Sequence, residues 1–415
     1  MSKKGRNPRP PRSISERVRA IYQRRPYPHG NSRALKAAGW ELCLEWVDTL
    51  GRTEANPAAP GRILVAGCGD GTEAFNVAAK YPKASVVAVD FSARSVAVAK
   101  RLQRRRKATG RIRFLQADLT APGLAARAGR DFDLITCHGV LSYIPALRRA
   151  FRNLAQCLAP SGVLYLGVNG QGHLNTRMRA ALPSLGLDPE TFIPSAQAEE
   201  TIRLCEEVLM GEGFPRFAHL GHPFLASDVF GPLNQCLTVE QWSRHARGAG
   251  LFLRGNWAAI PLFGKVVEKD LEHRLLPRSR AEVCRVFERL VPTRFHRLLY
   301  SRTPEAVPPW MNVRRLARWR PAVTSLYRLR LPRSPGKVRD RLVPVRITSA
   351  AYELQSRWRM AEWEAELLRR SDGSRTLGEI MRGLPLAVPA PELRKQLYLL
   401  QQLGIINLLP PRSSD

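Results

Sequence analysis

Three glycines alternate with other residues directly after a short apolar run, at Gly67, Gly69 and Gly71. Glycine allows the backbone to pass close beneath a ligand and to adopt the positive φ that a tight turn requires. A helix is expected after this turn, and the first N–H groups of a helix lack partners and attract an anionic group. The pattern predicts a loop that holds a small cofactor; a tight turn without a ligand is the alternative.

An acid, Asp90, ends the next apolar run, nineteen residues after Gly71. An acid at this position can bind both hydroxyls of a ribose, and a helix N-cap is its alternative role. Loops that bind NAD follow the spacing G-x-G-x-x-G, whereas the sixth position here is Thr72. The spacing therefore disfavours an NAD-dependent enzyme.

The G-x-G-x-G spacing resembles motif I of the class I methyltransferases that use S-adenosylmethionine (SAM). The resemblance continues in order through Asp118 and the segments 133–142 and 158–165, over about 110 residues. The chain resembles bacterial members that carry an accessory region and a winged-helix-like C-terminal domain. The resemblance implies that SAM is the cofactor and that Asp118 pairs with the adenine amine.

The resemblance also implies a set of cofactor contacts. Many members carry an acid two residues before the first glycine, where this chain has Val65, and Glu73 is the substitute that we expect. The expected contacts are Gly67, Cys68, Gly69, Asp70, Gly71, Glu73, Asp90, Phe91, Asp118, Leu119 and His138.

Strands and helices alternate around these residues. Continuous apolar strands separated by helices indicate a buried parallel sheet with crossover helices on both faces. We therefore expect an α/β, Rossmann-like, doubly wound and mostly parallel sheet. The expected strands are 63–66, 85–89, 112–116, 132–137 and 163–168, and the expected helices are 72–80, 94–107 and 146–158.

Further elements divide the chain into five expected regions. Residues 171–260 lose the alternation and look mainly helical, and residues 350–410 have a winged-helix-like outline that resembles small peptide-binding domains. A packing or dimerisation unit is the alternative there. The regions are a basic tail with a helical lead-in (1–50), the catalytic domain (51–170), an accessory or substrate region (171–269), a basic Pro/Arg-rich connection (270–346) and the C-terminal domain (347–415).

Candidate catalytic residues follow from the chemistry of methyl transfer. The sulfonium methyl of SAM is electrophilic, so the protein is expected mainly to bind, align and exclude water. An acceptor hydroxyl or amine can require a base, and His138 and Tyr143 lie where the strands end. A hydrogen-bonded loop residue is the alternative for His138, and Cys137 is expected to be a core thiol.

Candidate acceptor contacts lie outside the glycine-loop domain. The segment 25–30 resembles a Tyr-Pro-Tyr-Pro segment that precedes the catalytic domain of some bacterial methyltransferases. There it is expected to fold over the active site, which implies contacts from Tyr22 and Tyr27. An extended linker is the alternative. Asp228 is a third candidate, in a segment that resembles the accessory region of the same proteins.

The formal net charge of +31 raises a second class of function. Residues 1–36 and residues 311–346 each hold eleven Lys/Arg and a single acid. Such charge suits a polyanion, or is a solvated surface. We expect a methyltransferase whose unidentified acceptor is a protein, a peptide or a metabolite. The alternative is an RNA methyltransferase or a non-enzymatic RNA-binding protein.

Cysteine usage and hydropathy indicate the cellular compartment in which the protein is expected. The seven cysteines are scattered, with no CxxC pair and no Cys/His cluster at zinc spacing, so free thiols and no bound metal are expected. No apolar run reaches the roughly 18 residues that a membrane span needs. The first twelve residues lack the apolar segment of a secretory signal. A cytoplasmic protein without membrane partners is expected, and its oligomeric state is left open.

Overall fold

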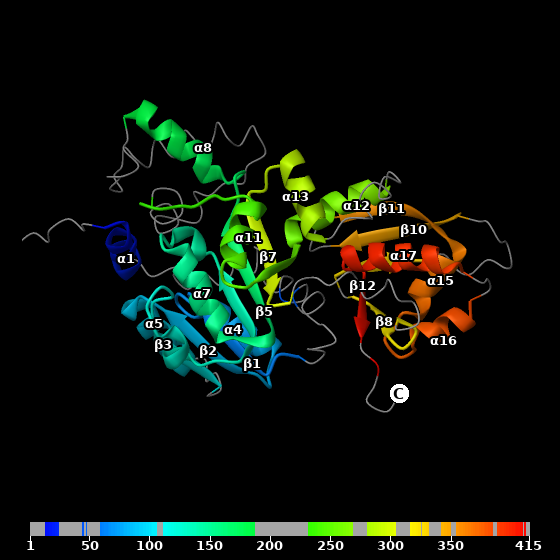
Figure 1. The fold of residues 1–415 in the computed structure, drawn as a ribbon, viewed down its shortest axis with the longest axis horizontal. Helices are drawn as coiled ribbons and strands as arrows, with labels where there is room; N and C mark the ends of the chain where they lie inside the picture. The colour runs from blue at the N-terminus through cyan, green and yellow to red at the C-terminus, as the bar shows by residue number, and fades with distance from the viewer. Residues whose placement is uncertain are drawn as a thin grey trace, which may run out of the picture.

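The computed structural model describes residues 13–24, 44, 47, 59–105, 111–186, 231–268, 280–303, 316–324, 326–331, 342–349, 354–384, 388–409 and 411. These residues form one large sheet with helices on both faces and a smaller C-terminal unit beside it (Figure 1).

The large sheet has seven strands in the order β3-β2-β1-β4-β5-β7-β6. The first five strands along the chain are parallel, and β7 is antiparallel to both β5 and β6. This confirms the expected Rossmann-like, mostly parallel sheet. The strands are β1 (Arg62–Ala66), β2 (Ser85–Asp90), β3 (Ile112–Gln116), β4 (Phe132–His138), β5 (Leu158–Asn169), β6 (Phe252–Asn256) and β7 (Phe295–Ser301).

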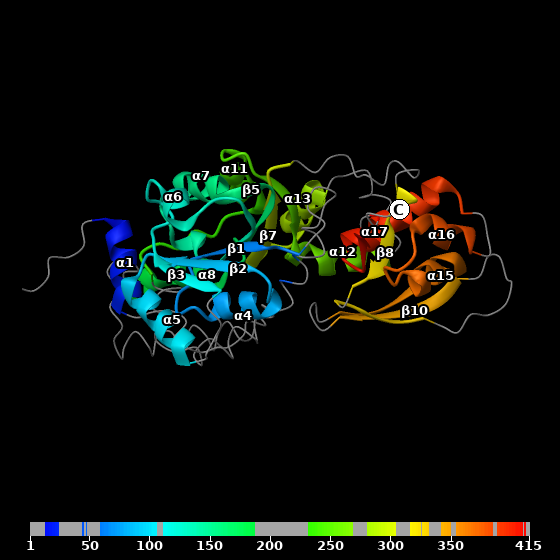
Figure 2. The same ribbon diagram turned by 90° about the horizontal axis from the view of Figure 1, so that it is seen from below.

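Helices cover both faces of this sheet (Figure 2). The central strands form because their side chains are buried on both sides: in β1, Ile63, Leu64 and Val65 are fully buried. One face carries α4 (Thr72–Lys80) and α5 (Ala93–Arg105), and the other carries α6 (Leu124–Ala128), α7 (Leu147–Cys157) and α11 (Val239–Arg247).

The sheet is completed by a strand that the sequence does not predict. Residues 270–346, expected to be a basic connection, contain α13 (Arg280–Leu290) and also the unexpected β7, whose Leu298, Leu299 and Tyr300 are fully buried. Strand β7 pairs antiparallel with both β5 and β6. It has no clear local pattern, and it lies within Arg- and Pro-rich sequence, so the sequence alone does not predict it. The expected domain boundaries stay predictions.

The C-terminal unit is built from two small sheets and three helices. Strands β9 (Arg328–Arg330), β10 (Leu342–Ser349) and β11 (Leu354–Ala361) form an antiparallel sheet, and β8 (Arg320–Val323) pairs with β12 (Ile406–Leu409). The helices are α15 (Glu362–Arg370), α16 (Leu377–Arg382) and α17 (Ala390–Gln402). The winged-helix assignment stays a prediction.

The remaining elements connect these units or lie at the edge of the large sheet. They are α1 (Ile14–Arg24), η1 (Leu141–Tyr143), α8 (Leu174–Ala181), η2 (Leu182–Leu185), η5 (Trp257–Ala259) and α12 (Ile260–Glu268). Helix α1 lies at the end of the sheet farthest from the C-terminal unit (Figure 2). Among the described residues, no helix is long and apolar enough to cross a bilayer, and no three His, Cys, Asp or Glu side chains are grouped to hold a metal ion.

Candidate functional site

The glycine loop between β1 and α4 has the backbone conformation that its sequence predicts. Gly67, Gly69 and Gly71 have φ angles of +81°, +52° and +88°. A Cβ atom on Gly67 would lie 2.3 Å from a methyl carbon of Val140. Glycine is therefore required here both for the left-handed backbone and for close packing.

Asp90 faces this loop from the end of β2. Its Oδ2 accepts a hydrogen bond from Gly69 N–H at 2.9 Å, and its Oδ1 accepts one from Ser92 N–H at 2.8 Å. Burial raises the pKa of Asp90, while the two backbone N–H groups lower it. The carboxyl is only 8% exposed and points toward the bend, as a ribose-binding acid must.

Three other residues of the loop act mainly on its local structure. Asp70 Oδ1 accepts hydrogen bonds from the Thr72 N–H at 3.1 Å and the Thr72 hydroxyl at 2.7 Å, so it orders the start of α4. Cys68 is buried, and burial followed by the neighbouring carboxylates raises the pKa of its thiol well above the ordinary value. It is therefore a neutral thiol at physiological pH.

Glu73 connects α4 to β4. The hydroxyl of Thr136 donates to Glu73 Oε1 at 2.6 Å, and the carboxyl is 8% exposed. Burial raises the pKa of Glu73 to about 8, with the Thr136 hydrogen bond acting in the opposite direction. Its expected role as a substitute for the acid missing at Val65 stays a prediction.

Asp118, Phe91 and Leu119 lie at the β2 and β3 side of the loop. Asp118 Oδ2 accepts a hydrogen bond from Arg19 at 2.8 Å, and its Oδ1 accepts two from Thr120. The Arg19 guanidinium also lies 5.7 Å from the centre of the Phe91 ring. Leu119 is buried, and its carbonyl accepts from Asn153 at 2.8 Å. Helix α1 thus contacts the expected adenine end of the site.

Tyr22 lies between two of the other predicted site residues. Its ring centre is 5.9 Å from that of Phe91 and 6.4 Å from that of Tyr143, both in edge-to-face geometry. The structure therefore brings one candidate contact from the lead-in segment to the site. The other two candidates, Tyr27 and Asp228, lie outside the described residues.

His138 ends β4 and is held by aromatic side chains. Its Nδ1 is 2.8 Å from the Tyr165 hydroxyl, and its ring stacks on Tyr165 and tilts against Phe295. Burial, and then the charge of Arg297, lowers the pKa of His138 to about 3. A Cβ on Gly167 would lie 2.4 Å from this ring, so Gly167 makes room for it.

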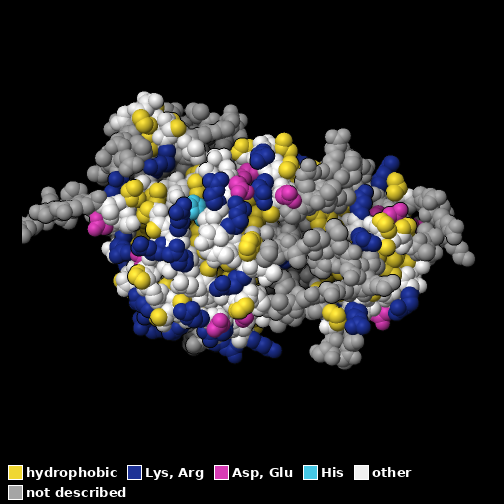
Figure 3. All heavy atoms as spheres, in the orientation of Figure 1, with side chains coloured by type: hydrophobic (Ala, Val, Ile, Leu, Met, Phe, Trp, Pro, Cys, Tyr) yellow, Lys and Arg dark blue, Asp and Glu magenta, His cyan; other side chains and the backbone are white. Residues whose placement is uncertain are grey.

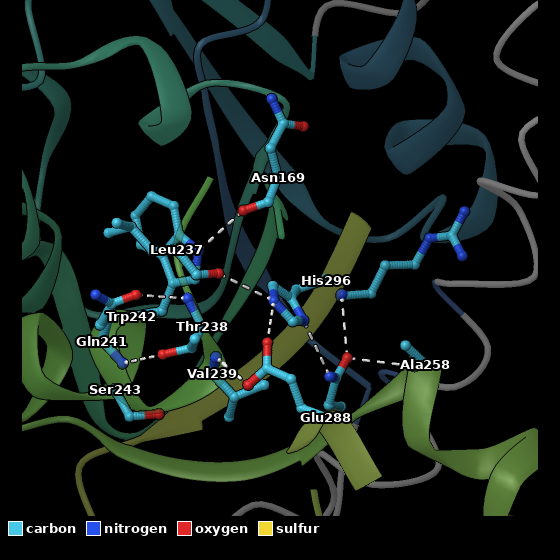
Figure 4. Close-up of polar contacts among 12 residues, drawn as sticks. Asn169, Leu237, Thr238, Val239, Gln241, Trp242, Ser243, Ala258, Glu288 and His296 are labelled. Carbon is cyan, nitrogen blue, oxygen red and sulfur yellow. Dashed lines mark hydrogen bonds and ion pairs between the residues drawn. The ribbon is translucent and has the colours of Figure 1, made fainter. Parts of the chain in front are cut away.

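Asn169 contacts a candidate site residue, and sequence reasoning did not single it out. Its Nδ2 donates to the Tyr143 hydroxyl at 3.2 Å and to Asn234 Oδ1 at 2.8 Å, and its N–H donates to Ser142 Oγ at 2.9 Å. Its side chain points away from the network of Leu237 to Ser243 (Figure 4). The available signal was a polar residue that ends the long apolar run of β5.

A buried polar network supports this edge of the sheet (Figure 4). His296 Nε2 is 3.0 Å from Glu288 Oε1 and 3.1 Å from the Leu237 carbonyl, while Glu288 Oε2 accepts from Val239 N–H at 2.7 Å. These bonds join β7, α13 and the start of α11. They fix the segment that follows Asn234 against the carboxyl end of β5.

The glycine-loop domain is similar in sequence to known methyltransferases. A family model described as "Methyltransferase domain" matches residues 64–164. An uncharacterized protein of Synechococcus, syc1184_c, is 32% identical over 168 residues, which are 38% of each chain. A trans-aconitate 2-methyltransferase of Methylobacterium nodulans is 33% identical over 107 residues, 26% of this chain and 38% of the relative. The chain therefore spans less than half the length of these relatives.

A solved structure extends the likeness in fold. PKMT2 from Rickettsia typhi in complex with AdoHcy has a TM-score of 0.57 and 14% identity, covering 88% of this chain and 75% of that one. At that identity the comparison shows a shared fold. The family model therefore marks residues 64–164 as similar to methyltransferase domains, and the solved structure shows that the chain shares the fold of a protein that binds AdoHcy.

Proposed function

We propose that this protein transfers the methyl group of SAM to an acceptor bound at the carboxyl edge of the parallel sheet. The observation that carries the proposal is the 2.9 Å hydrogen bond from Gly69 N–H to Asp90 Oδ2. It turns the acid at the end of β2 toward the glycine loop, in the arrangement that suits a nucleoside whose ribose faces the acid.

The residues of this edge have separate tasks in the proposal. The backbone of Gly67–Gly71 passes beneath the cofactor, Asp90 binds the ribose hydroxyls, and Phe91 with Asp118 contacts the adenine. SAM, when bound, supplies an electrophilic methyl group, so the protein has to align the acceptor and exclude water. Tyr22, which contacts both Phe91 and Tyr143, covers the cofactor from α1.

The electrostatics of the site restrict the acceptor. A group whose pKa is about 3, as for His138, is a weak base at neutral pH, so His138 is suited to hydrogen bonding rather than to proton abstraction. An acceptor that is nucleophilic without loss of a proton to His138, such as a carboxylate or an unprotonated amine, fits this site best. We propose that it belongs to a protein, a peptide or a metabolite; the Methylobacterium relative is named for the metabolite trans-aconitate.

Titration calorimetry with SAM, with its demethylated product and with NAD tests the cofactor assignment. We expect the first two to bind and NAD not to bind. The variant Asp90→Asn should weaken SAM binding at least tenfold, about 1.4 kcal/mol, because one ribose acceptor becomes a donor. Asp131→Asn, an exposed control, should bind SAM like the unaltered protein. Equal affinity in the Asp90→Asn variant would remove the ribose contact from the proposal.

The RNA alternative is tested by transfer rather than by binding. Labelled methyl groups from SAM are transferred in a native lysate, and the product is treated separately with nuclease and protease. A product that is sensitive to protease, or is small and resists both enzymes, supports the proposal. A nuclease-sensitive product would establish RNA as the acceptor.

A further inference from the structure

A groove opens where α7 begins. It is lined by three arginines of α7, Arg148, Arg149 and Arg152, together with Gln235 and His245. Its volume is about 460 Å³, within the range of pockets that hold small molecules. No acidic residue is among its lining residues, and Figure 3 shows Lys and Arg side chains gathered around α7 with few acids between them.

Unlike several other arginines of this domain, the three have no side-chain partner among the described residues. Within the described part of the chain, none of the three forms a hydrogen bond or ion pair through its side chain, and all are exposed. Arg113 and Arg127, by contrast, donate to main-chain carbonyls at 2.9 Å and 2.7 Å. Arginine cations that converge on a concave site without a carboxylate are suited to an anionic ligand.

His245 lies on the groove within reach of the charge of Arg148. Its ring stacks on Phe151, with ring planes 6° apart, on the wall of the groove. Burial, and then the positive charges of Arg148 and Arg244, lowers the pKa of His245. No side chain caps the start of α7 and its first turn holds no acid, so the helix adds positive potential. An anion would offset the repulsion among these groups.

The groove lies beside the proposed active site. The loop between η1 and α7 forms one wall, and Gln235 holds it through hydrogen bonds to the carbonyls of Ser142 at 2.7 Å and Ile144 at 2.6 Å. Tyr143, which contacts Tyr22 and Asn169, lies between those two residues. The wall of the groove and Tyr143, which we place near the cofactor, therefore belong to the same short segment of the chain.

We propose that this groove binds the anionic end of a small-molecule methyl acceptor, one that carries phosphate or carboxylate groups. Arg148, Arg149 and Arg152 hold the anion, and the atom to be methylated extends along the η1 loop toward Tyr143. The inference rests on the proposed methyl transfer and specifies its substrate class.

Two matched triple variants test it. One replaces Arg148, Arg149 and Arg152 by Ala, and the other replaces the exposed Arg101, Arg104 and Arg105 of α5, which removes the same charge elsewhere. Pyrophosphate and citrate are titrated into each protein in phosphate-free buffer, by calorimetry and by the imidazole NMR signal of His245. We expect both probes to bind at least tenfold more weakly to the α7 variant than to the unaltered protein or the α5 variant. In the latter two proteins, binding should also shift the NMR signal of His245. The probe that binds more tightly shows whether the groove prefers phosphate or carboxylate groups.

Other outcomes overturn the proposal. An equal loss of probe affinity in both variants, or no saturable binding of either probe, would show that the arginines are a solvated basic surface. An RNA oligonucleotide that binds more tightly than either probe and loses affinity in both variants would make the surface a polyanion site. SAM is titrated into all three proteins as well. Absence of SAM binding in all three proteins would count against the methyltransferase proposal. If the α7 variant binds SAM normally but has lost anion binding, the result supports the groove as the site of the acceptor's anionic end.

Discussion

Glu73 is a residue whose ionisation is strongly altered by the fold. Its carboxyl is buried between α4 and β4, and burial raises its pKa from 4.5 to about 8. The folded protein therefore keeps a proton that the unfolded chain releases above pH 4.5. Stability from this group is fully present below the unfolded pKa and is lost as pH rises through the folded pKa.

The variant Glu73→Gln isolates this contribution. The free energy of unfolding of the unaltered protein should fall relative to that of the variant by about 1.4 kcal/mol per pH unit between pH 4.5 and 8. Gln is neutral throughout, and its Oε1 can still accept from Thr136. The measurement is urea unfolding at several pH values. A difference between the two proteins that does not change with pH would refute the raised pKa.

At the level of elements, α1 determines how closed the proposed cofactor site is. Arg19 of this helix binds Asp118, at 2.8 Å, with side chains 49% and 33% exposed. Such a pair is screened by solvent and contributes at most about 1 kcal/mol. If α1 covers the cofactor, Arg19→Ala should speed SAM dissociation by up to about fivefold without altering the fold. Stopped-flow displacement measures this rate, and Arg17→Ala on the same helix is the control. Unchanged rates in both variants would mean that α1 does not retain the cofactor.

At the level of the whole molecule, the Glu288–His296 pair joins parts of the chain that are distant in sequence. Glu288 on α13 binds His296 on β7 and the backbone of Val239 on α11. Its removal leaves the N–H of Val239 without an acceptor, at a cost of roughly 1–3 kcal/mol, while His296 keeps its contact with the Leu237 carbonyl. Glu288→Ala should therefore lower the free energy of unfolding by about 2 kcal/mol. Glu282→Ala, exposed on the same helix, should change it by under 1 kcal/mol. If chemical denaturation gives the same loss of unfolding free energy for both variants, the network does not stabilise the sheet.

The sequence by itself determined the parallel half of the fold and the cofactor loop. Each of those features has a local signature: apolar runs such as residues 63–66, three glycines at turn spacing, and Asp90 at the end of a strand. Their physical causes act within a few residues, since burial on both faces requires continuous apolar strands and the turn requires positive φ. That is why the expected strands lie within β1 to β5 of the structure, although β5 begins at Leu158, five residues before the expected start of its strand.

The tertiary structure alone decided the rest of the edge where the site lies. Strand β7 exists because β5 and β6 pair with it from both sides, and Asn169 gained its role from contacts with Tyr143 and Asn234. The groove at α7 likewise needs His245 and Gln235, which are distant from the arginines in sequence. Contacts between distant segments leave no periodic trace in either one, because each side chain is selected by its partner rather than by its neighbours.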